Sequence, residues 1–191
     1  DLQPNNCRVL FVDNELDGQI TSFGESFWRE ATAISPLLKD LLGRGAPSKV
    51  VYTDRYLRSP LTARLLYEIV SVVAHDSPTT KLDIATSWKR PDRASNSIRG
   101  DWGDSSTQKK CLETLFDKTQ TTVRIPADYR TLEHARKLTL YWADGSVVML
   151  VLDQGVGFLQ EQGRVPFDLS LAPSKQAKDL RGKKFKIRHT G

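Results

Sequence analysis

The sequence predicts an α/β fold with a mixed β-sheet flanked by helices. Over the first two thirds of the chain, short apolar runs alternate with longer segments of helical periodicity, and a hairpin pattern follows them. The chain has 191 residues, of which 39% are hydrophobic and 27% charged, as in ordinary globular proteins. We expect a single domain over residues 1–172, followed by a basic tail over residues 173–191.

The strands and helices of the first part are predicted from periodicity and from capping residues. Short apolar or alternating runs predict strands at 8–13, 49–53, 81–86 and 121–125. Apolar residues at helical spacing predict helices at 23–34, 36–42, 61–75 and 107–119. Ser35-Pro36 and Ser59-Pro60 each offer an N-cap followed by a proline that suits the first helical turn. The polar segment 87–105, rich in Gly, Ser and Arg, is expected to be a loop.

The last third of the chain changes to a β pattern. Residues 137–142 and 147–153 are rich in β-branched and aromatic side chains and flank Asp144-Gly145, a strong turn signal because glycine tolerates a positive φ. We therefore expect a β-hairpin there and a further strand at 167–171. No long helix pattern follows Gly155-x-Gly157, so this pair predicts a bulge or a tight bend and not a nucleotide-binding loop.

The charge is concentrated at the C-terminal end. The whole chain has a formal net charge of +5, whereas residues 173–191 alone hold seven Lys or Arg against one Asp. Such a segment favours polyanions, either nucleic acid or an anionic lipid surface, and makes Lys183 and Lys184 candidate phosphate contacts. The alternative is a solvated terminus or a linker.

Several features bear on the compartment. No run approaches the ~18 consecutive apolar residues of a membrane-spanning helix. The first residues contain neither an initiator Met nor a signal pattern, which suggests a piece of a longer protein. Cys7 and Cys111 form neither a metal-ligand spacing nor a disulfide framework. We expect a cytoplasmic protein without a metal or cofactor, in which Cys111 is a core thiol.

The first candidate site lies where a predicted strand ends and a capped helix begins. Asp54, Arg55, Arg58 and Ser59 occupy this turn. Ligands of open α/β sheets bind beyond the carboxyl ends of strands, and a helix N-terminus with arginines suits phosphate. In this interpretation Asp54 orients one of the arginines. The alternative is that Asp54 pairs with Arg55 or Arg58 and merely fixes the loop.

Two further groups of residues have the chemistry of nucleic-acid contacts. His134 and Arg136 are two apart at the entry to a predicted strand, so they can share a face and handle phosphate, with His134 as a candidate nucleophile. The alternative for His134 is a structural hydrogen bond. Aromatic residues interleaved with arginines in the polar loop fit single-stranded nucleic acid, unless each Trp packs under its own loop: Trp88, Arg90, Arg93 and Trp102.

These patterns together resemble one protein group. The 52–57 segment between a strand and a helix, and His134-x-Arg136 before the hairpin and the 153–158 segment, resemble the non-catalytic phospholipase-D-like domain of MIT-domain proteins. They also resemble the terminal module of large phage-defence DEAD/DEAH-box helicases of the Druantia and DpdJ kind. The similarity covers roughly residues 20–172 and implies a phospholipase-D-like fold.

The resemblance does not extend to a complete catalytic motif. The superfamily motif is His-x-Lys, four residues and then Asp; here His134 matches, Arg136 replaces the Lys, and Tyr141 occupies the acidic position. Active members need two such motifs, and this sequence supplies no second one, so only a dimer could bring two copies of His134 together. A phosphate-binding remnant is therefore favoured over catalysis.

The prediction is a non-catalytic accessory domain that binds nucleic-acid phosphates within a larger helicase-type anti-phage protein. The resemblance to the helicase module implies a motor domain outside this chain. The sequence lacks a Gly-x-x-x-x-Gly-Lys-Ser/Thr loop, so we do not expect the chain itself to hydrolyse ATP. The expected partners are DNA or another nucleic acid, the parent helicase or other defence proteins, and a second copy of this chain. One alternative is a phosphodiesterase or nuclease that uses His134 across a dimer. The other is a membrane-associating module that binds anionic lipid.

Overall fold

The computed structural model describes residues 8–10, 18–19, 23–57, 59–74, 77–88, 102, 104–152, 160–161 and 186–188. Over these residues the fold is α/β, with a six-stranded main sheet, a three-stranded small sheet and four α-helices. The α/β class with a mixed sheet is thus confirmed. The phospholipase-D-like classification stays a prediction.

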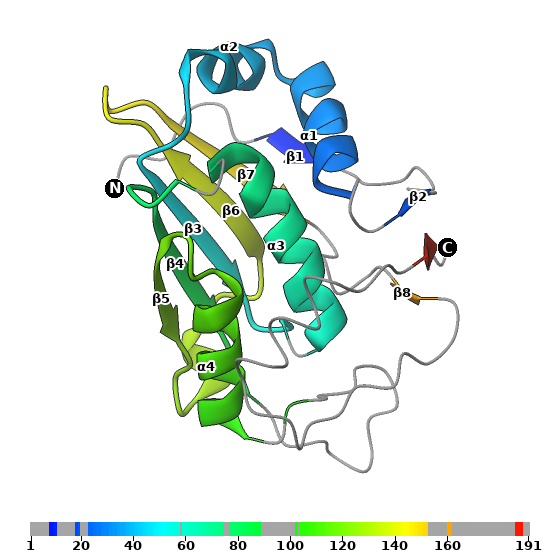
Figure 1. Ribbon diagram of the computed structural model, residues 1–191, viewed down its shortest axis with the longest axis vertical. Helices are drawn as coiled ribbons and strands as arrows, with labels where there is room; N and C mark the ends of the chain where they lie inside the picture. The colour runs from blue at the N-terminus through cyan, green and yellow to red at the C-terminus, as the bar shows by residue number, and fades with distance from the viewer. Residues whose placement is uncertain are drawn as a thin grey trace.

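The main sheet is mixed because a hairpin is inserted between parallel strands (Figure 1). Its spatial order is β1 (Arg8–Leu10), β7 (Val147–Leu152), β6 (Arg136–Tyr141), β3 (Lys49–Asp54), β4 (Lys81–Thr86) and β5 (Gln120–Arg124). Strands β3, β4 and β5 are parallel, and β1 is parallel to β7. Strand β6 is antiparallel to both of its neighbours, β3 and β7. The predicted hairpin is therefore confirmed, and Gly145 in its turn has a φ of 86°.

The structure describes four α-helices, and side chains cap the starts of α2 and α4. The four helices are α1 (Phe23–Ile34), α2 (Pro36–Arg44), α3 (Pro60–Ala74) and α4 (Ser105–Leu115). The Ser35 hydroxyl accepts the Leu38 amide at 3.3 Å, which confirms the predicted cap of α2. The Asp104 carboxylate accepts the Thr107 amide at 2.7 Å and starts α4 two residues before the predicted start.

The predicted C-terminal end of α4 also needs correction. The helix ends at Leu115 and not at Thr119, because the chain turns back toward β5. In that turn the amide and the hydroxyl of Thr119 both donate to the Phe116 carbonyl, at 3.0 and 2.9 Å. The first strand covers Arg8–Leu10 of the predicted 8–13, and the predicted strand at 167–171 lies outside the described residues.

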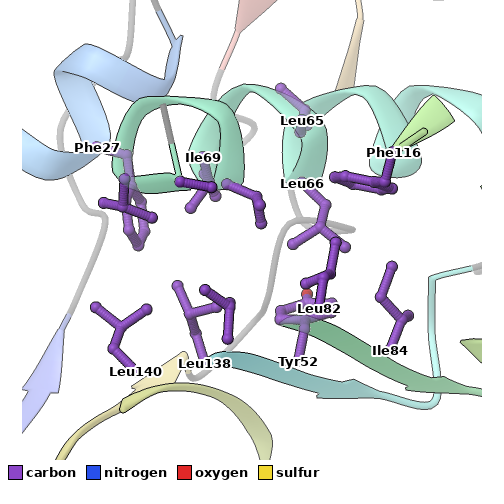
Figure 2. Packing of buried hydrophobic residues seen from close by; sticks show 14 of the residues in the cluster. Phe27, Tyr52, Leu65, Leu66, Ile69, Leu82, Ile84, Phe116, Leu138 and Leu140 are labelled. Carbon is purple, nitrogen blue, oxygen red and sulfur yellow. The ribbon is translucent and has the colours of Figure 1, made fainter. Parts of the chain in front are cut away.

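The core lies between one face of the main sheet and the helices. Helices α1, α3 and α4 all lie on the same side of the sheet (Figure 1). Figure 2 shows side chains of α3 meeting strand residues across this layer. The contributing strand positions alternate, so that β3 buries Val50, Tyr52 and Asp54 while Lys49, Val51 and Thr53 remain half-exposed on the other face.

Helix α1 approaches α3 so closely that only glycine fits at the crossing. A Cβ atom at Gly24 would lie 2.0 Å from the carbonyl oxygen of Glu68. One turn further, the indole Nε1 of Trp28 donates to the Ile69 carbonyl at 2.7 Å. The two contacts fix α1 against α3 by backbone as well as by side-chain packing.

The small sheet joins distant parts of the sequence. Its order is β2 (Gly18–Gln19), β9 (Lys186–Arg188) and β8 (Gln160–Glu161), and both pairings are antiparallel. Strand β9 belongs to the segment predicted as a basic tail, so a part of that segment pairs with the N-terminal region. The domain limits themselves stay predictions.

Candidate functional site

The candidate site lies at the edge of the main sheet where β3 and β4 end and β6 begins. Because β6 is antiparallel to β3, the entry to β6 lies beside the exit from β3, with Thr53 opposite Lys137. In the same register Asp54, the last residue of β3, lies beside Thr86 of β4. This is the edge at which ligands of open α/β sheets bind, as the sequence predicts for Asp54 and its neighbours.

Asp54 is the buried centre of this edge. Its side chain is 0% exposed, so each carboxylate oxygen requires a partner. The Tyr52 hydroxyl donates to Oδ2 at 2.8 Å, and the Tyr56 backbone amide donates to Oδ1 at 2.7 Å. The Arg136 Nε lies 3.7 Å from Oδ1 and supplies the opposite charge. Asp54 therefore holds the turn after β3 and the start of β6 together.

Tyr56 connects this buried pair to the surface. The Arg136 guanidinium lies over the Tyr56 ring, with its central carbon 4.6 Å from the ring centroid. The Tyr56 hydroxyl and Nε2 of His134 are 3.2 Å apart, within hydrogen-bond distance, and which group donates depends on the imidazole tautomer. The two rings meet edge-on, with their centroids 5.7 Å apart. His134 itself is exposed, so a ligand can reach its imidazole while Tyr56 orients it.

Arg55 and Ser87 fix the loop beneath this cluster. The Arg55 guanidinium donates to the Leu132 carbonyl, close to the start of β6. The Ser87 hydroxyl donates to the Arg55 carbonyl at 2.5 Å, which ties the loop to the end of β4. Arg55 thus has a role in holding the loop, whether or not it also contacts a ligand.

The first turn of α3 is capped from within. The Ser59 hydroxyl accepts the Thr62 amide at 3.2 Å, and the Thr62 hydroxyl donates to the Ser59 carbonyl at 2.8 Å. Ser59 therefore acts as the predicted N-cap. Its proposed contact with phosphate stays a prediction, and Arg58 lies outside the described residues.

The two tryptophans predicted to stack on bases differ in how deeply they are buried. Trp102 is only 4% exposed and belongs to the core, a position that favours the packing alternative over stacking on a base. Trp88 is half-buried and packs against the core. The cations predicted to accompany them, and those of the basic tail, lie outside the described residues and stay predictions: Arg90, Arg93, Lys183 and Lys184.

Sequence reasoning did not include Tyr52, Tyr56 and Ser87 among the site residues. Tyr52 and Tyr56 lie two positions before and after Asp54, within the 52–57 segment, and this spacing is the sequence feature that could have indicated their contacts with Asp54. Ser87 donates to a backbone carbonyl, and no sequence pattern marks that role. Within the described ranges, no group of three His, Cys, Asp or Glu is placed to hold a metal ion, and no helix is long and apolar enough to cross a bilayer.

Fold and site together define an α/β domain with its helices gathered on one face and a polar, cation-containing cluster at the carboxyl edge of its sheet. A comparison with known protein families identifies the family of this domain. The chain belongs to the family described as the C-terminal domain of the DEAD/DEAH box helicase YjiV, which matches residues 6–191. This confirms the prediction of a helicase-associated terminal module. No curated protein and no solved structure matches the chain.

Proposed function

We propose that this chain is a non-catalytic accessory domain of a DEAD/DEAH-box helicase and that the Tyr56–His134–Arg136 cluster contacts nucleic-acid phosphates. The observation that carries the proposal is the exposed His134 imidazole, held by the Tyr56 hydroxyl at the carboxyl edge of the sheet. The basic segment 173–191, whose charge exceeds the net charge of +5 of the whole chain, would supply further contacts to a polyanion bound by this domain. A domain of this kind would hold the nucleic acid beside the motor and act in the cytoplasm.

The cluster supports binding better than phosphoryl-transfer chemistry. Arg136 pairs with Asp54 and stacks on Tyr56, so its guanidinium serves first to build the cluster. A nucleophilic His needs a second acid for the leaving group, and the nearest side chain hydrogen-bonded to His134 is the weakly acidic Tyr56. The position of His134-x-Arg136 at the entry to β6 fits a phospholipase-D-like ancestry, and the resemblance to defence helicases supports a role against phage.

Binding is tested with fluorescently labelled single- and double-stranded DNA at two salt concentrations. Wild type should bind, with log affinity falling by about 0.7 to 0.9 per phosphate neutralised for each unit of log salt. His134→Ala and Tyr56→Phe should each weaken binding about fivefold, which corresponds to the roughly 1 kcal/mol of one hydrogen bond. Tyr67→Phe on α3, outside the cluster, is the matched control and should bind as wild type does.

Two results would refute the proposal. One is an absence of DNA binding by the wild type at low salt. The other is unchanged binding by both cluster variants while the chain retains its fold by circular dichroism.

The exposure of His134 also favours a second candidate, a phosphodiesterase that pairs two copies of His134 across a dimer. Cleavage of bis-(p-nitrophenyl) phosphate is the test. Turnover that rises faster than linearly with protein concentration and vanishes in His134→Ala would establish it. We expect no turnover above background.

A further inference from the structure

The face of the main sheet opposite the helices has a composition of its own. The strand registers place three rows of side chains on this face, here called the open face, from β7 across to β5, and two of these residues, Thr139 and Ala85, are buried. The first row is Val147, Tyr141, Lys49, Lys81 and Gln120. The second is Met149, Thr139, Val51, Asp83 and Thr122. The third is Val151, Lys137, Thr53, Ala85 and Arg124. Apolar side chains gather toward β7, and charged side chains gather toward β4 and β5.

The apolar part of the open face lies on β7 and its neighbours. Tyr141 and Val147 are register partners and are 36% and 37% exposed, which makes them two of the few large hydrophobic residues at the surface of the described chain. Met149, Val151 and Val51 lie beside them and are half-exposed. The side chains of β7 form an aliphatic strip, and the buried Thr139 of β6 separates this strip from Val51 on β3.

The charged part of the open face carries cations in excess. Lys49 donates to Asp83 at 2.6 Å, and this hydrogen bond raises the pKa of the Lys49 ammonium. Lys137 forms an ion pair with Glu133. Lys81 and Arg124 are exposed, and no carboxylate pairs with either of them in the part of the chain that the structure describes. The open face therefore presents two uncompensated positive charges beside an aliphatic strip.

We propose that this open face is a docking surface for an acidic amphipathic segment of the parent helicase. The apolar side of such a segment would cover Val147, Met149 and Val151, and its carboxylates would face Lys81 and Arg124. A sheet that carries helices on one face is completed when a second layer buries the apolar part of its other face. Charge complementarity selects an acidic segment. This inference does not rest on nucleic-acid binding by the cluster.

The chemistry of the strip favours a protein segment over nucleic acid. Unpaired bases stack on aromatic rings, and Tyr141 is the single aromatic residue among the three rows. Valine and methionine side chains instead fit the aliphatic residues of a protein segment. Nucleic acid on this face is therefore an outcome that the test has to exclude.

Thiol labelling measures whether the face is covered. Met149→Cys is made in a Cys7→Ser background, both in the 191-residue chain and in the full-length helicase. The native Cys111 is buried, and burial raises its thiol pKa to about 12, so it should not react with a maleimide at neutral pH. Met149→Cys should react at least tenfold more slowly in the helicase than in the chain alone. Lys110→Cys on the exposed side of α4 is the control and should react equally in both.

Charge reversal tests the acidic character of the partner. Lys81→Glu together with Arg124→Glu should restore rapid labelling of Met149→Cys in the full-length helicase, whereas Lys39→Glu together with Lys110→Glu on the helical side should not. Three results would overturn the proposal. The first is equal labelling in both proteins, and the second is slow labelling in the 191-residue chain alone. The third is protection of that chain by an added oligonucleotide.

Discussion

An aspartate turn of the same geometry occurs at both ends of the main sheet, the carboxyl ends of its parallel strands and the opposite ends, but one turn is buried and the other is exposed. At the carboxyl edge, Oδ1 of Asp54 accepts the amide of Tyr56, two residues further on, at 2.7 Å. At the opposite edge, Oδ1 of Asp144 accepts the amide of Ser146, also two residues further on, at 2.9 Å. Asp54 is 0% exposed, whereas the Asp144 side chain is 52% exposed. The local geometry is thus shared, and burial is what differs.

The buried carboxylate of Asp54 requires hydrogen-bond and charge partners within the protein, whereas the exposed carboxylate of Asp144 does not. Asp54 has a tyrosine hydroxyl at 2.8 Å and Arg136 at 3.7 Å as further partners. Asp144 faces Arg44 at a similar distance of 3.7 Å, but water solvates both groups. The comparison shows that the same aspartate turn has different uses. Only the buried aspartate is surrounded by protein side chains that act as its partners, and only there do these side chains form a candidate binding site. The candidate site is the edge where these partners lead to an exposed side chain, His134.

The largest expected effect comes from removing the buried carboxylate. Asp54→Ala removes the acceptor of the Tyr52 hydroxyl and the opposite charge beside the largely buried Arg136, and we expect the free energy of unfolding to fall by about 3 kcal/mol. Urea denaturation followed by circular dichroism measures this. Asp144→Ala is the matched control and should retain most of the stability. A loss of less than about 1 kcal/mol in Asp54→Ala would show that the two edges do not differ as described.

A smaller effect is expected from the turn glycine at the opposite edge. Gly145 has a φ of 86°, and no atom lies within 4 Å of the Cβ that an alanine would add. The cost of Gly145→Ala is therefore a backbone cost of about 1 kcal/mol, without a steric clash. Gly43→Ala in α2 also meets no atom within 4 Å and should stabilise the chain instead, because alanine favours the helix. Thermal unfolding of both variants gives the sign of each change, and a more stable Gly145→Ala would contradict the expected backbone cost.

The smallest effect is the pH dependence of the exposed turn. The hydrogen bond from the Ser146 amide lowers the pKa of Asp144 from its ordinary value of 3.8. A lowered folded-state pKa stabilises the chain above pH 3.8, and this contribution disappears as the pH falls through the folded-state value. Asp144→Asn keeps the acceptor oxygen and removes the charge. The difference in melting temperature between wild type and Asp144→Asn should therefore be present at pH 7 and vanish at strongly acid pH. A difference that grows on acidification would contradict this assignment.

The sequence predicted local structure well where short patterns determine it. The hairpin followed from Asp144-Gly145, and the start of α2 followed from Ser35-Pro36. The start of α4 was missed because Asp104 was read as part of the preceding loop, although its carboxylate is an N-cap. The position of the hairpin between β1 and β3 could not be predicted, since strand order depends on contacts between segments far apart in the sequence.

For the candidate site, the sequence indicated separate groups of residues and not their arrangement in space. Asp54, His134 and Arg136 were each singled out, but in two separate groups. The structure joins them because β6 runs beside β3, so that Arg136 supplies an opposite charge for Asp54. The predicted pairing of Asp54 with Arg55 or Arg58 stays a prediction. Tyr56 was not predicted to link them, because its contacts with Arg136 and His134 are through space. Trp102 lies in the core, as the packing alternative for this residue expected, although its sequence neighbourhood is polar.

The insertion of the hairpin between parallel strands has a consequence for the order in which the chain folds. Strands β3, β4 and β5 can pair one after another as they are synthesised, with α3 and α4 covering them. The other side of β3 has no neighbouring strand until β6 is synthesised. Strand β1 likewise cannot pair with β7 until β7 has been synthesised. Contacts between distant segments form slowly, and a bare strand edge pairs readily with other chains. Synthesis of the hairpin is therefore the step that completes the main sheet, because it gives β3 its second neighbour and β1 its partner.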